Sequence, residues 1–447
     1  MATSSTGSAC SSATRARCRR GTRTPSSRPC ATRRVRVSKI GHKPNAQGRP
    51  AQNDPLLAFR EEFPILEKTS YLVSNSLGPM PRTVPDKLAE YARDWGEHGV
   101  KAWNRGWWEQ PVNVGNEIAP LINADPGEVV MMPNVTIAQT AVLSALDFPK
   151  DRDTIVMTEL DFPSVRYAYA ELAQRLGARV VVVKSDDGMT IDTDKLLASI
   201  DERTRLVAVS HVLFRSAFLM DANRICEHAH RAGSLVSLDS FHAVGIVPVD
   251  VKESKVDFLT GGVLKWLCGG PGACFLYVSP SVRDELKPAL TGWQAHTRPF
   301  AFEDSMEYTT GAFRWLNGTP VIPALYAAAE GPKILRRAGI EAIRDKSVRL
   351  TTRLIALADQ RGYTVNAPRD AVRRGGTVAI DVPHGYEVTQ HLLSKNVLVD
   401  FRVSAGIRIA PHFFTREEEL DAAVQEIETC LETGSWQRYS EKIAVVT

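Results

Sequence analysis

Runs of hydrophobic residues alternate with amphipathic segments along the middle of the chain. Short continuous runs rich in Val, Ile and Leu are typical of strands that are buried on both faces. Such runs occupy residues 154–160, 179–184, 205–212, 234–239 and 256–262. Segments with the apolar spacing of helices lie between them, at residues 164–177, 193–200 and 222–233. The alternation predicts an α/β fold with a mainly parallel sheet covered by helices on both faces.

The length of the chain indicates more than one structural part. A single hydrophobic core rarely grows beyond about 250–300 residues, and this chain has 447. We expect a large domain at residues 81–320 and a smaller α+β domain at 321–435. An N-terminal arm at 53–80 precedes them, and tails at 1–52 and 436–447 complete the predicted organisation.

The first fifty residues differ in composition from the rest. They contain ten Arg and two Lys but no acidic residue, together with many Ser, Thr and Pro. Since the whole chain has a formal charge of +4, the other 397 residues carry −8. The segment has too little apolar surface to fold, so we expect it to be disordered. An organelle transit peptide, a nucleic-acid-binding tail and an extension from a misplaced start codon are the three interpretations, and the last is preferred.

Apolar runs, charge and cysteines in the rest of the chain indicate which compartment and which partners to expect. No run approaches the roughly 18 apolar residues of a membrane span, so no membrane association is expected. The acidic body gives no support for nucleic-acid binding by the fold. Four cysteines lie beyond the tail, namely Cys226, Cys268, Cys274 and Cys430, and their spacing requires neither disulfide nor metal. We therefore expect a cytoplasmic protein.

Polar and aromatic side chains gather at the ends of three of the predicted strands. Phe162 and Ser164 follow the first strand, Ser210 and His211 lie in the last part of the third, and Asp239 and His242 lie at and just beyond the end of the fourth. In parallel sheets, binding groups gather at the carboxyl ends of the strands. The sequence therefore predicts a binding site at this edge of the sheet.

Lys265 lies beyond the last predicted strand in the apolar, glycine-rich stretch GGVLKWLCGGPG at residues 261–272. Burial disfavours a charged ammonium, so a lysine in such a stretch becomes a neutral amine nucleophile whose natural partner is an aldehyde. A carboxylate at a neighbouring strand end, such as Asp239, completes the arrangement that pyridoxal phosphate needs. Spacing alone also permits a structural ion pair between these two residues.

Motifs for other chemistries are missing from the sequence. It contains no phosphate-binding loop of the G-x-x-x-x-G-K-[ST] type and no G-x-G-x-x-G after the first strand. His228 and His230 are two residues apart on a predicted helix and so do not share a face. We expect no metal site.

Several segments together resemble one family. Asp239-x-x-His242 and Lys265 followed by WLCGGPG are similar to fold-type-I pyridoxal phosphate enzymes of the class V aminotransferase group, and to kynureninases in particular. Further similar segments occur in the same order, namely NSLG (75–78), FPS (162–164), LTGW (290–293), FRWLNGTP (313–320) and GIRIAP (406–411). The resemblance covers about residues 60–435 and implies the large cofactor-binding domain and small C-terminal domain of that fold.

The resemblance also implies roles for individual residues. Lys265 would bond to the cofactor aldehyde and act as the catalytic base, and Asp239 would pair with the pyridine nitrogen. Cofactor contacts would come from Val135, Thr136, Phe162, Ser164, Ser210, Asp239, His242, Lys265, Trp293 and Asn317. Trp293 and Asn317 would reach the site from the second subunit of a homodimer. Asn75, Ser76 and Arg408 would bind an amino-acid substrate, with Arg408 on its α-carboxylate.

The sequence departs from the kynureninase pattern at three positions. Arg215 follows Phe214 where that family has an aromatic residue. Leu264 stands before the lysine where that family has a tyrosine, and Val165 stands where it has an aspartate. Neither side chain transfers a proton. Three reactions therefore stay open: hydrolytic cleavage of a Cβ–Cγ bond, transamination, and lyase or desulfurase chemistry. A binding module without catalysis is a further alternative, which Lys265, Asp239 and Arg408 disfavour.

Overall fold

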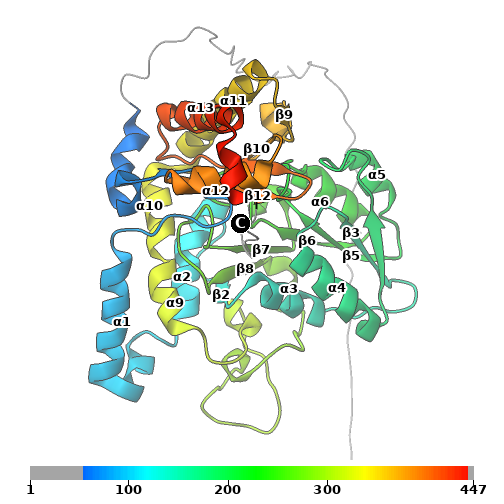
Figure 1. Ribbon diagram of the computed structural model, residues 1–447. Coiled ribbons are helices and arrows are strands. Elements are labelled where there is room, and N and C mark those ends of the chain that lie inside the picture. The colour runs from blue at the N-terminus through cyan, green and yellow to red at the C-terminus, as the bar shows by residue number, and fades with distance from the viewer. Residues whose placement is uncertain (1–53, 441–447) are drawn as a thin grey trace, which may run out of the picture. The chain divides into compact units, whose positions relative to one another are not determined.

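The computed structural model describes residues 54–440, and the structural statements below concern this part of the chain. The predicted disordered tail at 1–52 lies outside it, as do residues 441–447 of the predicted C-terminal tail. A large sheet occupies the centre, and a smaller sheet lies above it in the view of Figure 1.

The large sheet has seven strands. In spatial order they are β2 (Val129–Met132), β8 (Cys274–Val278), β7 (Phe258–Gly262), β6 (Leu235–Asp239), β5 (Thr204–Ser210), β3 (Thr154–Thr158) and β4 (Arg179–Val183). The neighbours from β7 to β4 pair in parallel, while β8 is antiparallel to both β7 and β2. The five strands predicted from hydrophobic runs are confirmed, each within two residues at its start and its end.

Helices cover both faces of this sheet because both faces are apolar. Alternate residues of β2 belong to different cores, with Val129 and Met131 in one and Val130 and Met132 in the other. The second core is closed by α3 (Val135–Ser144) and α4 (Pro163–Leu176). The first is closed by α2 (Gln110–Ile118), α5 (Thr193–Ala198), α6 (Ala222–Arg231), α7 (Val251–Ser254), α9 (Ile322–Ala328) and α10 (Glu330–Ala338).

The smaller sheet is antiparallel and has its own core. Its strands are, in spatial order, β12 (Asp400–Arg402), β13 (Gly406–Ile409), β10 (Val378–Asp381) and β9 (Thr364–Val365). The helices α11 (Ile340–Gln360), α12 (Gly385–Ser394) and α13 (Glu417–Thr433) pack on it. Separate cores agree with a small α+β part, although the exact division at residues 320 and 321 stays a prediction.

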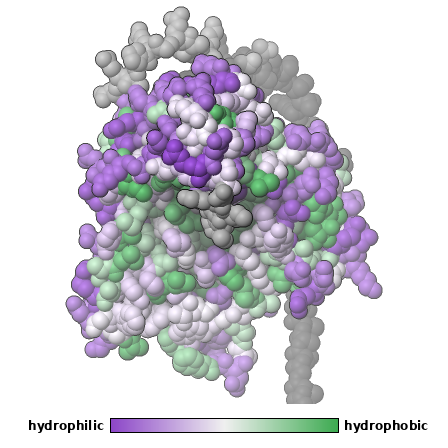
Figure 2. All heavy atoms as spheres, in the orientation of Figure 1, coloured by the Kyte–Doolittle hydropathy of each residue, from purple (hydrophilic) through white to green (hydrophobic). Residues whose placement is uncertain are grey.

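The N-terminal arm is tied to the C-terminal part of the chain. Its strand β1 (Ser70–Tyr71) pairs in parallel with β11 (Val397–Leu398), and Val73 forms a bridge with Ala410. The arm is followed by α1 (Val84–His98), which packs against α9, and a further short helix, α8 (Pro280–Arg283), follows β8. On the face shown in Figure 2, hydrophilic side chains gather over α11 and α13, while hydrophobic patches are scattered over the region of α1, α2 and α9.

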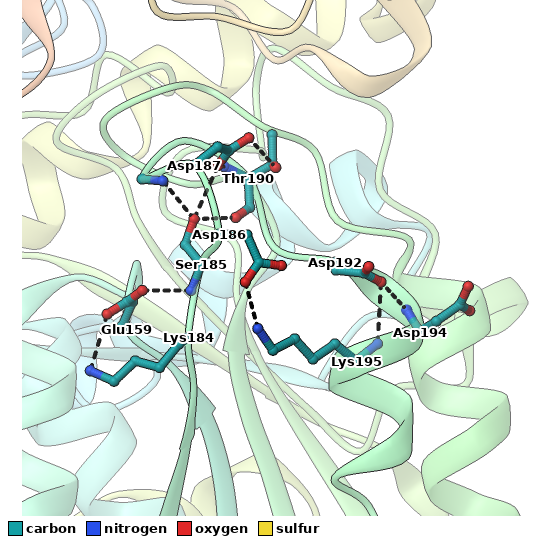
Figure 3. Close-up of polar contacts among 10 residues, drawn as sticks. Glu159, Lys184, Ser185, Asp186, Asp187, Thr190, Asp192, Asp194 and Lys195 are labelled. Atoms are coloured by element: carbon teal, nitrogen blue, oxygen red, sulfur yellow. Dashed lines mark hydrogen bonds and ion pairs between the residues drawn. The ribbon is translucent and has the colours of Figure 1, made fainter.

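An acidic connection joins β4 to α5 (Figure 3). Asp187 accepts hydrogen bonds from the backbone N–H groups of Met189 (2.8 Å) and Thr190 (2.7 Å), which closes a tight turn. Asp192 accepts from the N–H groups of Asp194 (2.8 Å) and Lys195 (3.2 Å) and thereby caps α5. These carboxylates satisfy the backbone donors of the turn and the helix start, which explains the acidic sequence.

Candidate active site

The carboxyl ends of β3, β5, β6 and β7 meet around a small pocket. Ser210 is in register with Asp239, and Asp239 with Thr260, so these strand ends are level. The pocket has a volume of about 130 Å³ and is lined by Phe162, Ser210, Val212, Phe214, Asp239, Phe241, His242, Leu264 and Lys265. The structure thus has a pocket at the edge of the sheet where the sequence predicts a binding site.

Lys265 places its amine among aromatic rings and an imidazole. Its Nζ lies 2.6 Å from Nε2 of His242, 4.6 Å from the ring centre of Phe241 and 5.5 Å from that of Phe162. The pKa of Lys265 is lowered to about 7, first by burial and then by the positive charge of Arg408. A substantial fraction of the amine is therefore neutral at neutral pH and available as a nucleophile.

Asp239 and His242 have unusual ionisation for the same reason. Burial raises the pKa of Asp239 to about 6, while the N–H of Phe241, which donates to its Oδ1 at 2.9 Å, favours the carboxylate. Burial, together with the charge of Lys265, holds the pKa of His242 well below its ordinary value. Within residues 54–440, Lys265 Nζ contacts His242 and forms no direct ion pair with Asp239, although the charge of each residue shifts the pKa of the other toward the ionised form.

Asp161 is a buried carboxylate that the sequence analysis did not single out. It accepts a hydrogen bond from the N–H of Thr158 and one from the N–H of Ser210, both at 2.7 Å. These bonds fasten the end of β3 to the end of β5. Asp161 thereby fixes the backbone next to Phe162 and Ser210, and its position directly before the FPS segment is the signal that could have identified it.

Arg408 lies on β13 and is buried, but it does not line the pocket. Its Nε donates to Oδ1 of Asp400 at 2.8 Å, its Nη2 donates to Oδ2 of the same carboxylate, and its Nη1 donates to the carbonyl of Phe214 at 2.6 Å. Arg402 also pairs with Asp400, at 3.1 Å. Since Phe214 does line the pocket, Arg408 stands directly behind its wall.

The NSLG segment runs against the lysine loop. The N–H of Gly78 donates to the carbonyl of Leu264 at 2.8 Å, and a Cβ on Gly78 would lie 2.2 Å from the carbonyl oxygen of Lys265. Asn75 is buried, yet neither its amide oxygen nor its amide nitrogen has a hydrogen-bond partner. Ser76 is half-buried beside it. A buried, unpaired amide is costly, so Asn75 is suited to receive a polar ligand.

Five other predicted residues lie apart from the pocket lining. Val135 and Thr136 begin α3, and Ser164 lies in the first turn of α4. Trp293 packs against Trp108, with ring centres 5.0 Å apart, and neighbouring Gly292 lies against the backbone of Asn317. Trp293 and Asn317 therefore sit close to each other, but this chain does not bring them to its own Lys265 pocket.

The pocket residues suit pyridoxal phosphate. A buried amine, a buried carboxylate and an aromatic ring surround one cavity, and these are the groups that hold an aldehyde, a pyridine nitrogen and a planar ring. Among the described residues, no group of three or more His, Cys, Asp or Glu side chains is arranged to hold a metal ion. No helix between residues 54 and 440 is long and apolar enough to cross a membrane.

Comparison with known proteins agrees with this arrangement. The family model described as aminotransferase class-V matches residues 70–417. A kynureninase of Geobacillus thermodenitrificans is 30% identical over 413 residues, covering 88% of this chain and 96% of the relative. A kynureninase of Pseudomonas fluorescens is 32% identical over 399 residues, covering 86% and 94%.

Solved structures support the fold. A cysteine desulfurase of Thermococcus onnurineus superimposes with a TM-score of 0.74 at 22% identity, covering 86% of this chain and all of that one. A mutant of the lyase C-DES with glycine covalently linked to its pyridoxal phosphate gives 0.75 at 21% identity, covering 82% and 98%. The predicted fold type and cofactor are confirmed. The chain belongs to the aminotransferase class-V family of pyridoxal phosphate-dependent enzymes, and within it the chain resembles kynureninase.

Proposed function

We propose that this enzyme is a kynureninase-like hydrolase that cleaves the Cβ–Cγ bond of an L-α-amino acid with a γ-keto group. One water is consumed: the acyl carbon leaves as a carboxylic acid, and the remaining three carbons leave as alanine. The match to kynureninases over most of their length supports this reaction. The observation that carries the proposal is the pocket in which Lys265, Asp239, His242 and Phe162 meet.

The residues of the pocket have distinct tasks in this proposal. Bound pyridoxal phosphate supplies an electron sink for the bonds of the substrate's α-carbon. Lys265 binds the cofactor through its neutral amine and, once released by the substrate, takes the α-proton at Nζ. Asp239 holds the pyridine nitrogen, Phe162 packs on the ring, and neutral His242 holds the amine in place at 2.6 Å.

Substrate binding falls to residues next to the pocket. We assign the α-carboxylate to Arg408, whose guanidinium lies behind Phe214 and would have a free N–H edge beside its bonds to Asp400 and Phe214. Asn75 offers its unpaired amide from the opposite segment. Val135, Thr136 and Ser164 would supply phosphate contacts from the first turns of α3 and α4.

Two apolar positions favour a second candidate, a class-V transaminase or β-lyase with the same cofactor. Leu264 lines the pocket beside Lys265, and Val165 is buried in the core under α4. Neither can relay a proton to a leaving acyl group. A desulfurase with Cys268 as nucleophile is disfavoured, because Cys268 is fully buried and burial raises the pKa of its thiol.

Spectroscopy tests the cofactor assignment. Purified protein with pyridoxal phosphate should show a visible absorption band that borohydride abolishes and that Lys265→Ala lacks. Wild-type protein that takes up no cofactor would exclude an enzyme of this class.

Product analysis separates the two reactions. Incubation with L-kynurenine or 3-hydroxy-L-kynurenine should release alanine in amounts equal to the aromatic acid. Absence of alanine with both substrates, together with conversion of the cofactor to its amine form by another amino acid, would favour the transaminase.

We also propose a cytoplasmic homodimer whose sites are completed by Trp293 and Asn317 of the second copy. An apolar groove of about 500 Å³ supports it, because Leu77, Met80 and Leu88 are exposed along this groove near the lysine loop. Met80→Asp should shift the sedimentation coefficient toward the monomer, whereas Val372→Asp, at a residue 74% exposed outside this groove, should not. A wild-type monomer at micromolar concentration would contradict the proposal.

A further inference from the structure

Phe241 is a pocket residue to which the sequence resemblance assigns no role. It lies two residues after Asp239, and its N–H donates to the Asp239 carboxylate at 2.9 Å, so its backbone is fixed to the expected partner of the pyridine nitrogen. Its ring centre is 4.6 Å from Nζ of Lys265, closer than the ring of Phe162 at 5.5 Å. The pocket amine therefore faces two aromatic rings from different segments.

Gly262 makes room for the Phe241 ring. A Cβ on Gly262 would lie 2.2 Å from Cζ and 2.5 Å from Cε2 of Phe241, distances that real side chains do not reach. The ring must therefore rest directly on the backbone at the end of β7. The backbone of Gly262 is not in a left-handed conformation, so glycine is required here for space. The closest atoms belong to the Phe241 ring, and Sγ of Cys274 would follow at 2.9 Å from a Cβ.

The order of the strands places the two rings on different sides of Asp239. Phe162 follows β3, and Phe241 rests on the last residue of β7. Between β3 and β7 lie β5 and β6, whose ends carry Ser210 and Asp239. A planar ring whose nitrogen is held by Asp239 would thus lie between the two phenylalanines.

We infer that Phe241 is a second aromatic contact for the cofactor ring, acting together with Phe162, and that Gly262 serves to position it. The inference rests on the pyridoxal phosphate enzyme described above. Aromatic contact on both sides of a planar ring excludes water and adds stacking energy to that of Phe162. The Phe241 N–H donates to the Asp239 carboxylate, so the residue that would hold the ring nitrogen also fixes the backbone of the residue that would contact the ring.

Cofactor affinity, independent of turnover, tests this inference. Cofactor-free protein is titrated with pyridoxal phosphate while quenching of tryptophan emission and circular dichroism of the cofactor band are followed. Phe241→Ala and Phe241→Leu should each raise the dissociation constant by about three- to tenfold, since leucine keeps bulk but has no aromatic face. Tyr167→Ala, which removes an exposed aromatic residue from α4, should leave it unchanged.

Gly262→Ala provides the second arm. The new Cβ would displace the Phe241 ring, so this change should also weaken cofactor binding. In the Phe241→Ala background the two closest contacts of the new Cβ are gone and only Sγ of Cys274 at 2.9 Å is left. Gly262→Ala should therefore reduce affinity less in that background than in the wild type. Far-ultraviolet circular dichroism and thermal melting of each variant verify that it is folded.

The outcomes are distinguishable. The inference is supported if both Phe241 variants bind the cofactor more weakly and if Gly262→Ala reduces affinity more in the wild type than in the Phe241→Ala protein. Unchanged or tighter binding by Phe241→Ala overturns it, because the ring would then lie outside the contact or obstruct the cofactor. Failure of the wild-type protein to bind pyridoxal phosphate would instead overturn the cofactor assignment itself.

Discussion

Asp400 should be far more important for stability than its place in a short edge strand suggests. Its carboxylate is fully buried, accepts hydrogen bonds from Arg408 and forms an ion pair with Arg402. Replacing it by asparagine in Asp400→Asn keeps the size of the side chain but removes the negative charge between two guanidinium groups. The change therefore leaves the buried charge of Arg408 without a counter-charge.

The burial of the Arg408–Asp400 pair determines how much folding free energy the substitution should cost. The side chains of Arg408 and Asp400 are 3% and 0% exposed, and loss of one partner from such a pair costs about 3–5 kcal/mol. Because asparagine can still accept one bond from Nε of Arg408, we expect about 3 kcal/mol. The Arg353–Asp421 pair has the same fork geometry, at 2.9 and 2.5 Å, but its side chains are 40% and 39% exposed. Asp421→Asn should therefore cost only about 0–1 kcal/mol.

Urea unfolding followed by tryptophan fluorescence and circular dichroism measures both variants under the same conditions. The expected result is a large fall in the transition midpoint for Asp400→Asn and a small one for Asp421→Asn. Equal shifts, or a cost below about 1 kcal/mol for Asp400→Asn, would refute the reasoning, because the buried arginine would then be stabilised by something other than this carboxylate.

Three further predictions concern the lysine loop and the ionisable groups. Gly78→Ala should abolish cofactor binding in a fluorescence titration, since its Cβ would lie 2.2 Å from the Lys265 carbonyl oxygen. The control is Gly96→Ala in α1, where a Cβ would meet no atom within 4 Å. This change should stabilise the protein by about 0.5–1 kcal/mol. The pKa of Lys265 near 7 predicts, in stopped-flow absorbance, that the rate of cofactor attachment rises with pH through about 7 and then levels off; a rise continuing to the ordinary value of 10.5 would contradict it. The hydrogen bond to Asp257 raises the pKa of His230, so its stabilisation is complete below 6.5 and is lost as pH rises through the raised value. His230→Gln should accordingly lower the urea midpoint more at about pH 5.5 than at about pH 9, and equal effects at both would argue against this linkage.

The local pattern of hydrophobic residues was sufficient to predict much of the fold. Each of the runs that form β3, β4, β5, β6 and β7 is apolar on both faces, and such runs favour a covered parallel sheet wherever they occur. The strand-end rule then predicted one site for Phe162, Ser210 and Asp239, because parallel strands bring their carboxyl ends to one edge. Lys265 was identifiable from its apolar neighbours, whose burial of the amine is what lowers its pKa.

Contacts between distant segments decided the rest. The bond from Arg408 to the carbonyl of Phe214 spans 194 positions, and no local pattern indicates that this arginine stands behind the pocket and not inside it. The ring of Phe241, which follows β6, fits near the amine because Gly262 at the end of β7 leaves space for it. Hydrophobic periodicity and strand order are properties of the chain taken segment by segment, so the sequence by itself determined the fold class and the residues at the strand ends. Which side chains line the cavity, which stand behind it and which polar atoms stay unpaired depend on packing between segments, and only the tertiary structure decided them.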